Sequence, residues 1–143
     1  MIYPFKKLDA VVMASGFSKR MGKNKLSLSY KGRTLLEATL EKISHIPFNE
    51  AIICGREEWV ESLADKYNFK YCYNSFADLG QSESIKLGAE NSTGEGIAFF
   101  PGDQPLLAED TILNLYYEFQ KTNLITIPTV EEDRFSPVFF SRR

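Results

Sequence analysis

The stretch Leu8–Lys25, LDAVVMASGFSKRMGKNK, decides the fold. Its first six residues, Leu8–Met13, form a short apolar run rich in β-branched side chains, which predicts a buried strand. The residues that follow are irregular in pattern, and Gly16 and Gly22 are points of permissive backbone. In a mainly parallel sheet, ligands bind beyond the carboxyl ends of the strands, so we expect a site directly after Met13.

Strands and helices alternate along the rest of the chain. Thr34, followed three residues later by Glu37, predicts a capping box that opens a helix, and His45 is expected to cap the end of that helix. Further helices are expected at 59–67, 82–91 and around 112–119, and further strands at 51–54, 69–73, 97–100, 124–127 and 137–140. This alternation predicts an α/β fold with a mainly parallel sheet covered by helices on both faces.

Length and composition exclude several classes of protein. The 143 residues, 43% of them hydrophobic, predict a single globular domain over residues 1–143. No apolar run is long enough for a membrane span, and the first residues do not resemble a signal peptide. Cys54 and Cys72 are too few for a disulfide scaffold, so we expect buried inert thiols in a cytoplasmic protein.

Positive charge is concentrated at the start of the chain. The net charge is −2, yet the first 33 residues hold eight basic residues against one acid. This asymmetry favours binding of a small anion in that region, the alternative being a solvated basic loop. A sequence pI of 5.5 argues against nucleic acid as the partner.

The loop after Met13 has the chemistry of a phosphate site without a standard phosphate motif. It matches neither G-x-x-x-x-G-K-[ST] nor G-x-G-x-x-G. The small residues at 14–16 allow backbone N–H groups to approach a ligand closely. Arg20 and Lys25 supply donors for phosphate oxygens, although an isolated basic residue is ordinarily a surface side chain.

A second loop, Phe99–Leu107 (FFPGDQPLL), places Asp103 directly after an apolar run. A carboxylate at the mouth of a sheet can hold Mg²⁺ together with substrate phosphates. The alternative is a plain turn, since Pro-Gly-Asp is common turn chemistry.

Four ordered segments resemble the nucleotidyltransferases that act on molybdenum cofactor. Met13–Lys25 is similar to that family's L-A-x-G-x-S-x-R-M-G-x-x-K signature, with Met13 in place of the first Leu. Asn74 with Gly80–Ser84 resembles its N…G-x-S-x-S segment, and Pro101–Leu106 resembles its metal motif. Pro137–Arg142 resembles a fourth block. The resemblance implies a Rossmann-like three-layer sandwich of the nucleotide-diphospho-sugar transferase type.

The resemblance also implies a reaction: transfer of CMP from CTP to the terminal phosphate of molybdopterin or molybdenum cofactor, with release of pyrophosphate. Lys25 would stabilise the α-phosphate, Arg20 would hold the β- and γ-phosphates, and Asp103 would bind Mg²⁺. Ser82 or Ser84 would bond the base. The nucleotide-binding residues that the resemblance implies are Ala14, Ser15, Gly16, Ser18, Gln81, Ser82 and Ser84.

Three segments, 14–16, 80–84 and 102–105, resemble the cytidylyl-transferring branch of the family. Guanylyl-transferring members carry a double glycine in the first loop, whereas this chain has Ser15 before Gly16, a side chain that narrows the base pocket and favours CTP. Three alternatives stay open: GTP as donor, a sugar or polyol phosphate as acceptor, and a non-catalytic accessory protein that serves molybdenum hydroxylases. A hydroxylase is also the expected partner that would accept the cofactor.

Two departures from the family's pattern bear on completeness. Cytidylyl-transferring members usually continue past the fourth block, so the chain is expected to lack a C-terminal segment with further acidic site residues. Phe135 and Ser136 also stand where Gly-His or Gly-Asn is usual.

Overall fold

The computed structural model describes residues 7–14, 29–75, 81–102, 107–122, 129–130, 133–134 and 137–141. The helices are α1 (Leu35–Ser44), α2 (Glu58–Tyr67), α3 (Gln81–Asn91) and α4 (Glu109–Thr122). The strands are β1 (Leu8–Ala14), β2 (Ser29–Tyr30), β3 (Arg33–Thr34), β4 (Glu50–Gly55), β5 (Lys70–Tyr73), β6 (Gly96–Pro101), β7 (Thr129–Val130), β8 (Asp133–Arg134) and β9 (Val138–Ser141).

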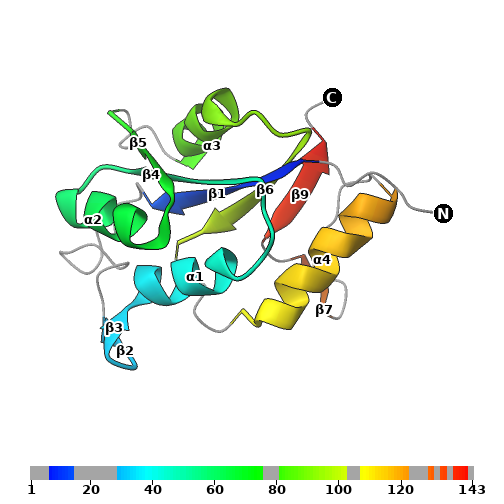
Figure 1. The fold of residues 1–143 in the computed structure, drawn as a ribbon, viewed down its shortest axis with the longest axis horizontal. Coiled ribbons are helices and arrows are strands. Elements are labelled where there is room, and N and C mark those ends of the chain that lie inside the picture. Colours follow the sequence, from blue (N-terminus) through cyan, green and yellow to red (C-terminus); the bar gives the residue numbers. More distant parts are fainter. Residues whose placement is uncertain are drawn as a thin grey trace.

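Five of these strands form one sheet in the order β5-β4-β1-β6-β9 (Figure 1). Strands β5, β4, β1 and β6 run parallel, and β9 pairs antiparallel with β6. The mainly parallel sheet predicted from the sequence is therefore confirmed, including a strand close to the predicted 137–140. The predicted strand at 124–127 lies outside the described residues.

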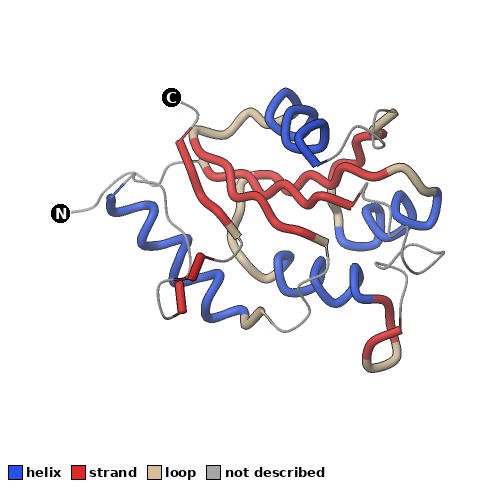
Figure 2. Tube along the Cα trace, turned by 180° about the vertical axis from the view of Figure 1, so that it is seen from behind, coloured by secondary structure: helices blue, strands red, loops and turns tan. Residues whose placement is uncertain are grey.

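Helices cover both faces of the sheet. Helix α3 lies on one face, and α1, α2 and α4 lie on the other, as both views show (Figures 1 and 2). Alternate residues of β1 serve the two cores: Leu8 and Val12 pack on the side of α1, whereas Val11 packs on the side of α3. This arrangement confirms the α/β sandwich. Within the described residues, no helix has both the length and the apolar character needed to cross a membrane.

Helix α3 packs unusually close to the centre of the sheet. A Cβ atom added at Gly88 would lie 2.3 Å from Cγ1 of Val11 on β1, far inside van der Waals contact. Glycine at this position lets the helix backbone rest on β1, which fixes the height of α3 above the sheet.

A short hairpin that the sequence did not predict precedes α1. Strands β2 and β3 pair antiparallel, and Lys31 and Gly32 between them both have positive φ, 49° and 86°. Two such residues are typical of a type I′ turn, which matches the twist of a hairpin. The sequence does not indicate this hairpin for two reasons. Lys-Gly is a weaker signal for this turn than Asn-Gly, and strands of two residues are too short to show an alternating pattern.

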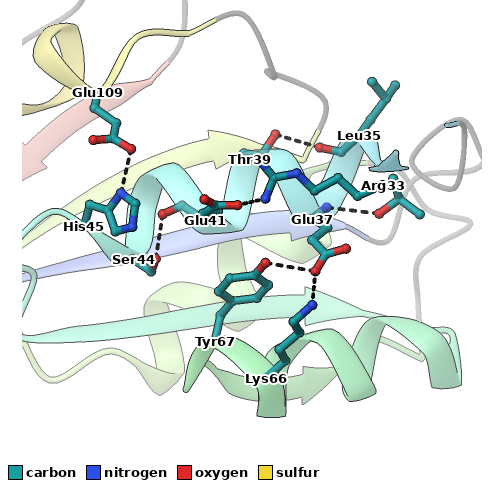
Figure 3. Close-up of polar contacts among 11 residues, drawn as sticks. Arg33, Leu35, Glu37, Thr39, Glu41, Ser44, His45, Lys66, Tyr67 and Glu109 are labelled. Carbon is teal, nitrogen blue, oxygen red and sulfur yellow. Dashed lines mark hydrogen bonds and ion pairs between the residues drawn. The ribbon is translucent and has the colours of Figure 1, made fainter. Parts of the chain in front are cut away.

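Helix α1 begins as predicted, but its capping box is only half formed. The Thr34 hydroxyl accepts a hydrogen bond of 3.1 Å from the Glu37 backbone N–H. The Glu37 carboxylate instead accepts from Lys66 Nζ (2.6 Å) and the Tyr67 hydroxyl (2.8 Å) on α2 (Figure 3). These bonds, that of Lys66 foremost, lower the pKa of Glu37. The carboxylate thus joins two helices rather than closing its own first turn.

At its other end α1 is capped by His45, as the sequence predicted. The His45 backbone N–H donates to the carbonyls of Lys42 and Ile43, and its Nδ1 lies 2.6 Å from Oε1 of Glu109 on α4 (Figure 3). His45 therefore links the end of α1 to the start of α4, which is a structural role.

The amino end of the sheet is closed by one buried carboxylate, Asp9 on β1, which is fully buried. Its Oδ1 accepts from the side-chain amide of Asn49 (2.9 Å). Its Oδ2 accepts from the Ser92 hydroxyl (2.6 Å) and from the backbone N–H groups of Thr93 (3.0 Å) and Gly94 (2.7 Å). Four donors from two distant segments thus compensate the desolvation of this charge, and they bind the end of α3 to the start of β1.

Candidate functional site

The carboxyl ends of the central strands lie side by side and define the candidate site. In the register of the sheet, Ala14 of β1 is opposite Gly55 of β4, and Met13 is opposite Pro101 of β6. The Gly102 backbone N–H donates to the Met13 carbonyl at 3.2 Å, which ties the chain leaving β6 to the chain leaving β1. The two loops singled out in the sequence therefore start next to each other.

This position is the topological switch point of the sheet. From β1 the chain crosses to β4 and then to β5, and it returns through α3 to β6 on the opposite side of β1. Connections that leave in opposite directions open a crevice at the carboxyl ends of the two strands between them, where α/β proteins bind their ligands. The crevice predicted by this rule lies between β1 and β6.

A third segment, the first turn of α3, is fixed next to these ends by buried polar contacts. The Asn74 backbone N–H, directly after β5, donates to the Gly55 carbonyl at 2.8 Å. Its side-chain amide donates to the Ser84 hydroxyl at 3.0 Å. The Cys54 thiol donates to the Ser84 carbonyl at 3.5 Å. Asn74 and Ser84 each expose only 3% of their surface.

The structure describes part of the predicted site set. Ala14 is buried at the end of β1, and Ser84 is buried in the first turn of α3. Gln81 and Ser82 begin α3, so the segment assigned to the nucleotide does open a helix at this end of the sheet. The predicted residues that lie outside the described part of the chain are Ser15, Gly16, Ser18, Arg20, Lys25 and Asp103.

The two cysteines near the site are buried, as predicted. Cys54 and Cys72 are free and buried, and they are register partners on β4 and β5. Burial raises the pKa of Cys54 to about 12 and also raises the pKa of Cys72. A thiol that stays protonated at neutral pH is a poor nucleophile and a poor metal ligand.

The donors that a divalent metal requires are not gathered among the described residues. That part of the chain holds no group of three or more His, Cys, Asp or Glu side chains able to hold a metal ion. Magnesium bound through one carboxylate and substrate phosphates needs no such cluster. Asp103, which follows Gly102 in the sequence, fits that mode by its chemistry.

The motif in the sequence includes Asn74 but does not indicate a role for it. A polar residue directly after an alternating strand was the available signal. Its significance depends on Ser84, ten positions later, whose approach to Asn74 requires the return of the chain from β5 to α3.

Comparison with known proteins agrees with this geometry. Residues 10–143 match the sequence model of a family described as the MobA-like NTP transferase domain. Proteins named "Probable molybdenum cofactor guanylyltransferase" from Methanosarcina mazei and Natranaerobius thermophilus are each 30% identical. The matches cover 91% and 92% of this chain but 61% and 64% of those proteins, so the chain spans about three fifths of their length.

Solved structures show the same fold. The crystal structure of Rv0371c from Mycobacterium tuberculosis H37Rv superposes with a TM-score of 0.81 at 23% identity, covering 97% of this chain and 73% of that one. A crystal structure of Rv0371c in complex with manganese superposes with a TM-score of 0.72 at 21% identity, covering 95% and 71% of the two chains.

Proposed function

The chain belongs to the family of MobA-like NTP transferase domains, and from that premise we propose that it transfers a nucleoside monophosphate from a nucleoside triphosphate to the terminal phosphate of molybdopterin or molybdenum cofactor. The observation that carries the proposal is that both motif loops start side by side at the switch point, while the first turn of α3 is held at the neighbouring carboxyl ends of β4 and β5. Each of the three comes from a segment whose sequence suits phosphate, metal or base binding.

The proposed reaction is an in-line displacement at phosphorus. An oxygen of the acceptor's terminal phosphate attacks the α-phosphorus of the nucleotide and forms a new phosphoanhydride bond. The bond from the α-phosphorus to the oxygen bridging it to the β-phosphorus breaks, and pyrophosphate leaves with that electron pair. The protein contributes position and charge neutralisation.

Roles for the basic and acidic residues are those that the family resemblance implies, and they suit the chemistry of these side chains. Lys25 stabilises the charge that develops on the α-phosphate, and Arg20 holds the β- and γ-phosphates as a planar fork. Asp103 would hold Mg²⁺, which would neutralise phosphate charge. The manganese in the complex of Rv0371c supports a divalent ion in this role. Backbone N–H groups at 14–16 and the residues Ser18, Gln81, Ser82 and Ser84 contact the nucleotide.

Two nucleotides, CTP and GTP, are candidates for the donor. Ser15 in place of a second glycine narrows the base pocket and favours CTP. The names of the curated relatives, which are guanylyltransferases, favour GTP at least as strongly. A non-catalytic role in handling cofactor for a molybdenum hydroxylase is the candidate from a different class of protein.

Calorimetry with CTP and with GTP, each with magnesium and with a chelator, separates these candidates. We expect magnesium-dependent binding of one nucleotide at least about tenfold more tightly than the other, a difference of about 1.4 kcal/mol. Pyrophosphate release on addition of molybdopterin then identifies the enzyme, and nucleotide binding without release identifies the accessory protein.

Asp103→Asn tests the metal assignment in the same assay. We expect it to abolish the difference between magnesium and chelator, because a neutral amide binds Mg²⁺ poorly. Asp110→Asn, an exposed change in the first turn of α4, is the matched control. If Asp103→Asn binds nucleotide as tightly as wild type both with magnesium and with the chelator, Asp103 is not the metal ligand.

A further inference from the structure

Asn74 is held in place before it reaches any other part of the site. Its backbone N–H donates to the Gly55 carbonyl at 2.8 Å, extending the pairing of β5 with β4 by one residue. The orientation of its side chain is therefore set by the sheet, and only 3% of the residue is exposed. A buried amide fixed in this way is a rigid anchor.

Ser84 is the point at which α3 meets that anchor. Its hydroxyl accepts from the Asn74 amide at 3.0 Å, and its carbonyl accepts from the Cys54 thiol at 3.5 Å. Residues at the ends of β4 and β5 thus hold both the side chain and the backbone of one residue in the first turn of α3. Gly88, one turn further on, rests on Val11 of β1.

We propose that Asn74 is a positioning residue of the nucleotide site, which holds the first turn of α3 against the carboxyl ends of β4 and β5, beside β1, through its bond to Ser84. The inference rests on the proposed function, because it deepens the role of that same site. Asn74 acts through Ser84 and touches no reacting atom.

The hydrogen bond also sets the direction of the Ser84 proton. Because the Asn74 amide can only donate from its nitrogen, the Ser84 oxygen is the acceptor of that bond and its own proton is directed elsewhere. Loss of the amide frees the hydroxyl to rotate and leaves a buried oxygen without this donor. Both effects disturb the turn that contains the nucleotide contacts proposed at Gln81 and Ser82.

The opposite end of the same helix offers a matched control. Ser92 follows α3 directly, is 4% exposed, and donates to Asp9 Oδ2 at 2.6 Å. Ser92→Ala and Asn74→Ala each remove one buried polar contact that ties α3 to the sheet. They differ in the end of the sheet at which the contact lies.

The test measures nucleotide affinity and turnover for wild type, Asn74→Ala, Asn74→Ser and Ser92→Ala, using CTP and GTP with magnesium. We expect Asn74→Ala to weaken the affinity for the preferred nucleotide, or raise its KM, about tenfold, as loss of a buried hydrogen-bond partner does. The kcat should change far less. Ser92→Ala should lower thermal stability and leave affinity and KM unchanged. Asn74→Ser keeps a small polar side chain too short to reach Ser84, so it serves if Asn74→Ala does not fold.

A double-variant cycle completes the test. If Asn74 acts through Ser84, the variant that combines Asn74→Ala with Ser84→Ala should bind no more weakly than the weaker of the two single variants. Additive losses, or an Asn74 variant whose affinity equals that of Ser92→Ala, would overturn the inference while the proposed function stands. Failure of wild type to bind either nucleotide would instead overturn the proposed function.

Discussion

The two ends of the sheet use buried polar groups in opposite ways. At the amino end, Asp9 is fully buried, and its carboxylate oxygens accept hydrogen bonds from four donors of the protein itself. At the carboxyl end, Ala14 ends β1, Gly55 ends β4 and Gly102 follows β6, and the polar pair Asn74–Ser84 holds one helix turn. The comparison shows that buried polar groups at the amino end hold the fold together, whereas the carboxyl end is where we propose that a ligand binds.

Helix α3 runs from one end of the sheet to the other. Its end is joined through Ser92 to Asp9, and its first turn is joined through Ser84 to Asn74. Changes along this one helix therefore separate what the contacts contribute to stability from what they contribute to binding.

The largest effect is expected from Asp9→Ala. The substitution leaves the Ser92 hydroxyl, the Asn49 amide and two backbone N–H groups without their acceptor. We expect the free energy of unfolding to fall by about 4 kcal/mol. Urea unfolding followed by circular dichroism measures it. A loss below about 1 kcal/mol would show that water replaces the carboxylate and that the amino end is not the closed unit described here.

Lys25→Ala is expected to act on the carboxyl end alone. Loss of one charge-assisted contact to phosphate should cost about 1.5–3 kcal/mol in transition-state stabilisation, roughly ten- to hundredfold in rate. Lys70→Ala, an exposed change on β5, is the control. Rates of pyrophosphate release report the difference, and normal turnover by a folded Lys25→Ala protein would remove Lys25 from the site.

Gly88→Ala tests the close packing of α3 on β1, midway between the two ends of the sheet. The new methyl group would lie 2.3 Å from Val11 Cγ1, so the helix must rise or Val11 must move. We expect a loss of about 1.5 kcal/mol in stability, typical of overpacking, accompanied by weaker nucleotide binding because the first turn moves with the helix. If stability falls but nucleotide affinity stays at the wild-type value, the first turn of α3 is held independently of the contact between Gly88 and Val11.

The last effect concerns Cys54 and is absent at neutral pH. Burial raises the pKa of this thiol in the folded protein from its usual 9.0 to about 12. Above pH 9 the unfolded chain loses a proton that the folded chain keeps, so stability falls as pH rises between 9 and about 12, and is unaffected below. The slope is at most about 1.4 kcal/mol per pH unit. Cys54→Ala should remove that part of the alkaline loss, and an identical alkaline profile in the variant would contradict the assignment.

The fold was predictable from the sequence because its elements carry strong local patterns. The apolar run of β1, the alternation before Tyr73 and the helical spacing of 59–67 and 112–119 each predicted the observed element type. The Thr34 cap of α1 was predictable as well, since its partner is three residues away. The hairpin of β2 and β3 was not, because strands of two residues carry no pattern.

The polar contacts that distinguish the two ends of the sheet were not predictable. Asp9 stands inside an apolar run, and its partners lie 40 to 85 positions away. Asn74 reaches Ser84 only after the chain has turned from β5 into α3. Such contacts depend on where elements meet in space. The sequence motifs at the carboxyl end still indicated phosphate chemistry, because loop composition expresses that chemistry locally.

Amide hydrogen exchange with and without magnesium and nucleotide tests the contrast between the two ends most directly. The N–H groups of residues 81–83, at the start of α3, have no acceptor within the helix and exchange readily unless a ligand covers them. We predict that CTP or GTP slows exchange in residues 81–83 and around Gly102, and leaves Thr93 and Gly94, whose N–H groups donate to Asp9, unchanged. Protection confined to Thr93 and Gly94, or equal protection at both ends, would contradict the account.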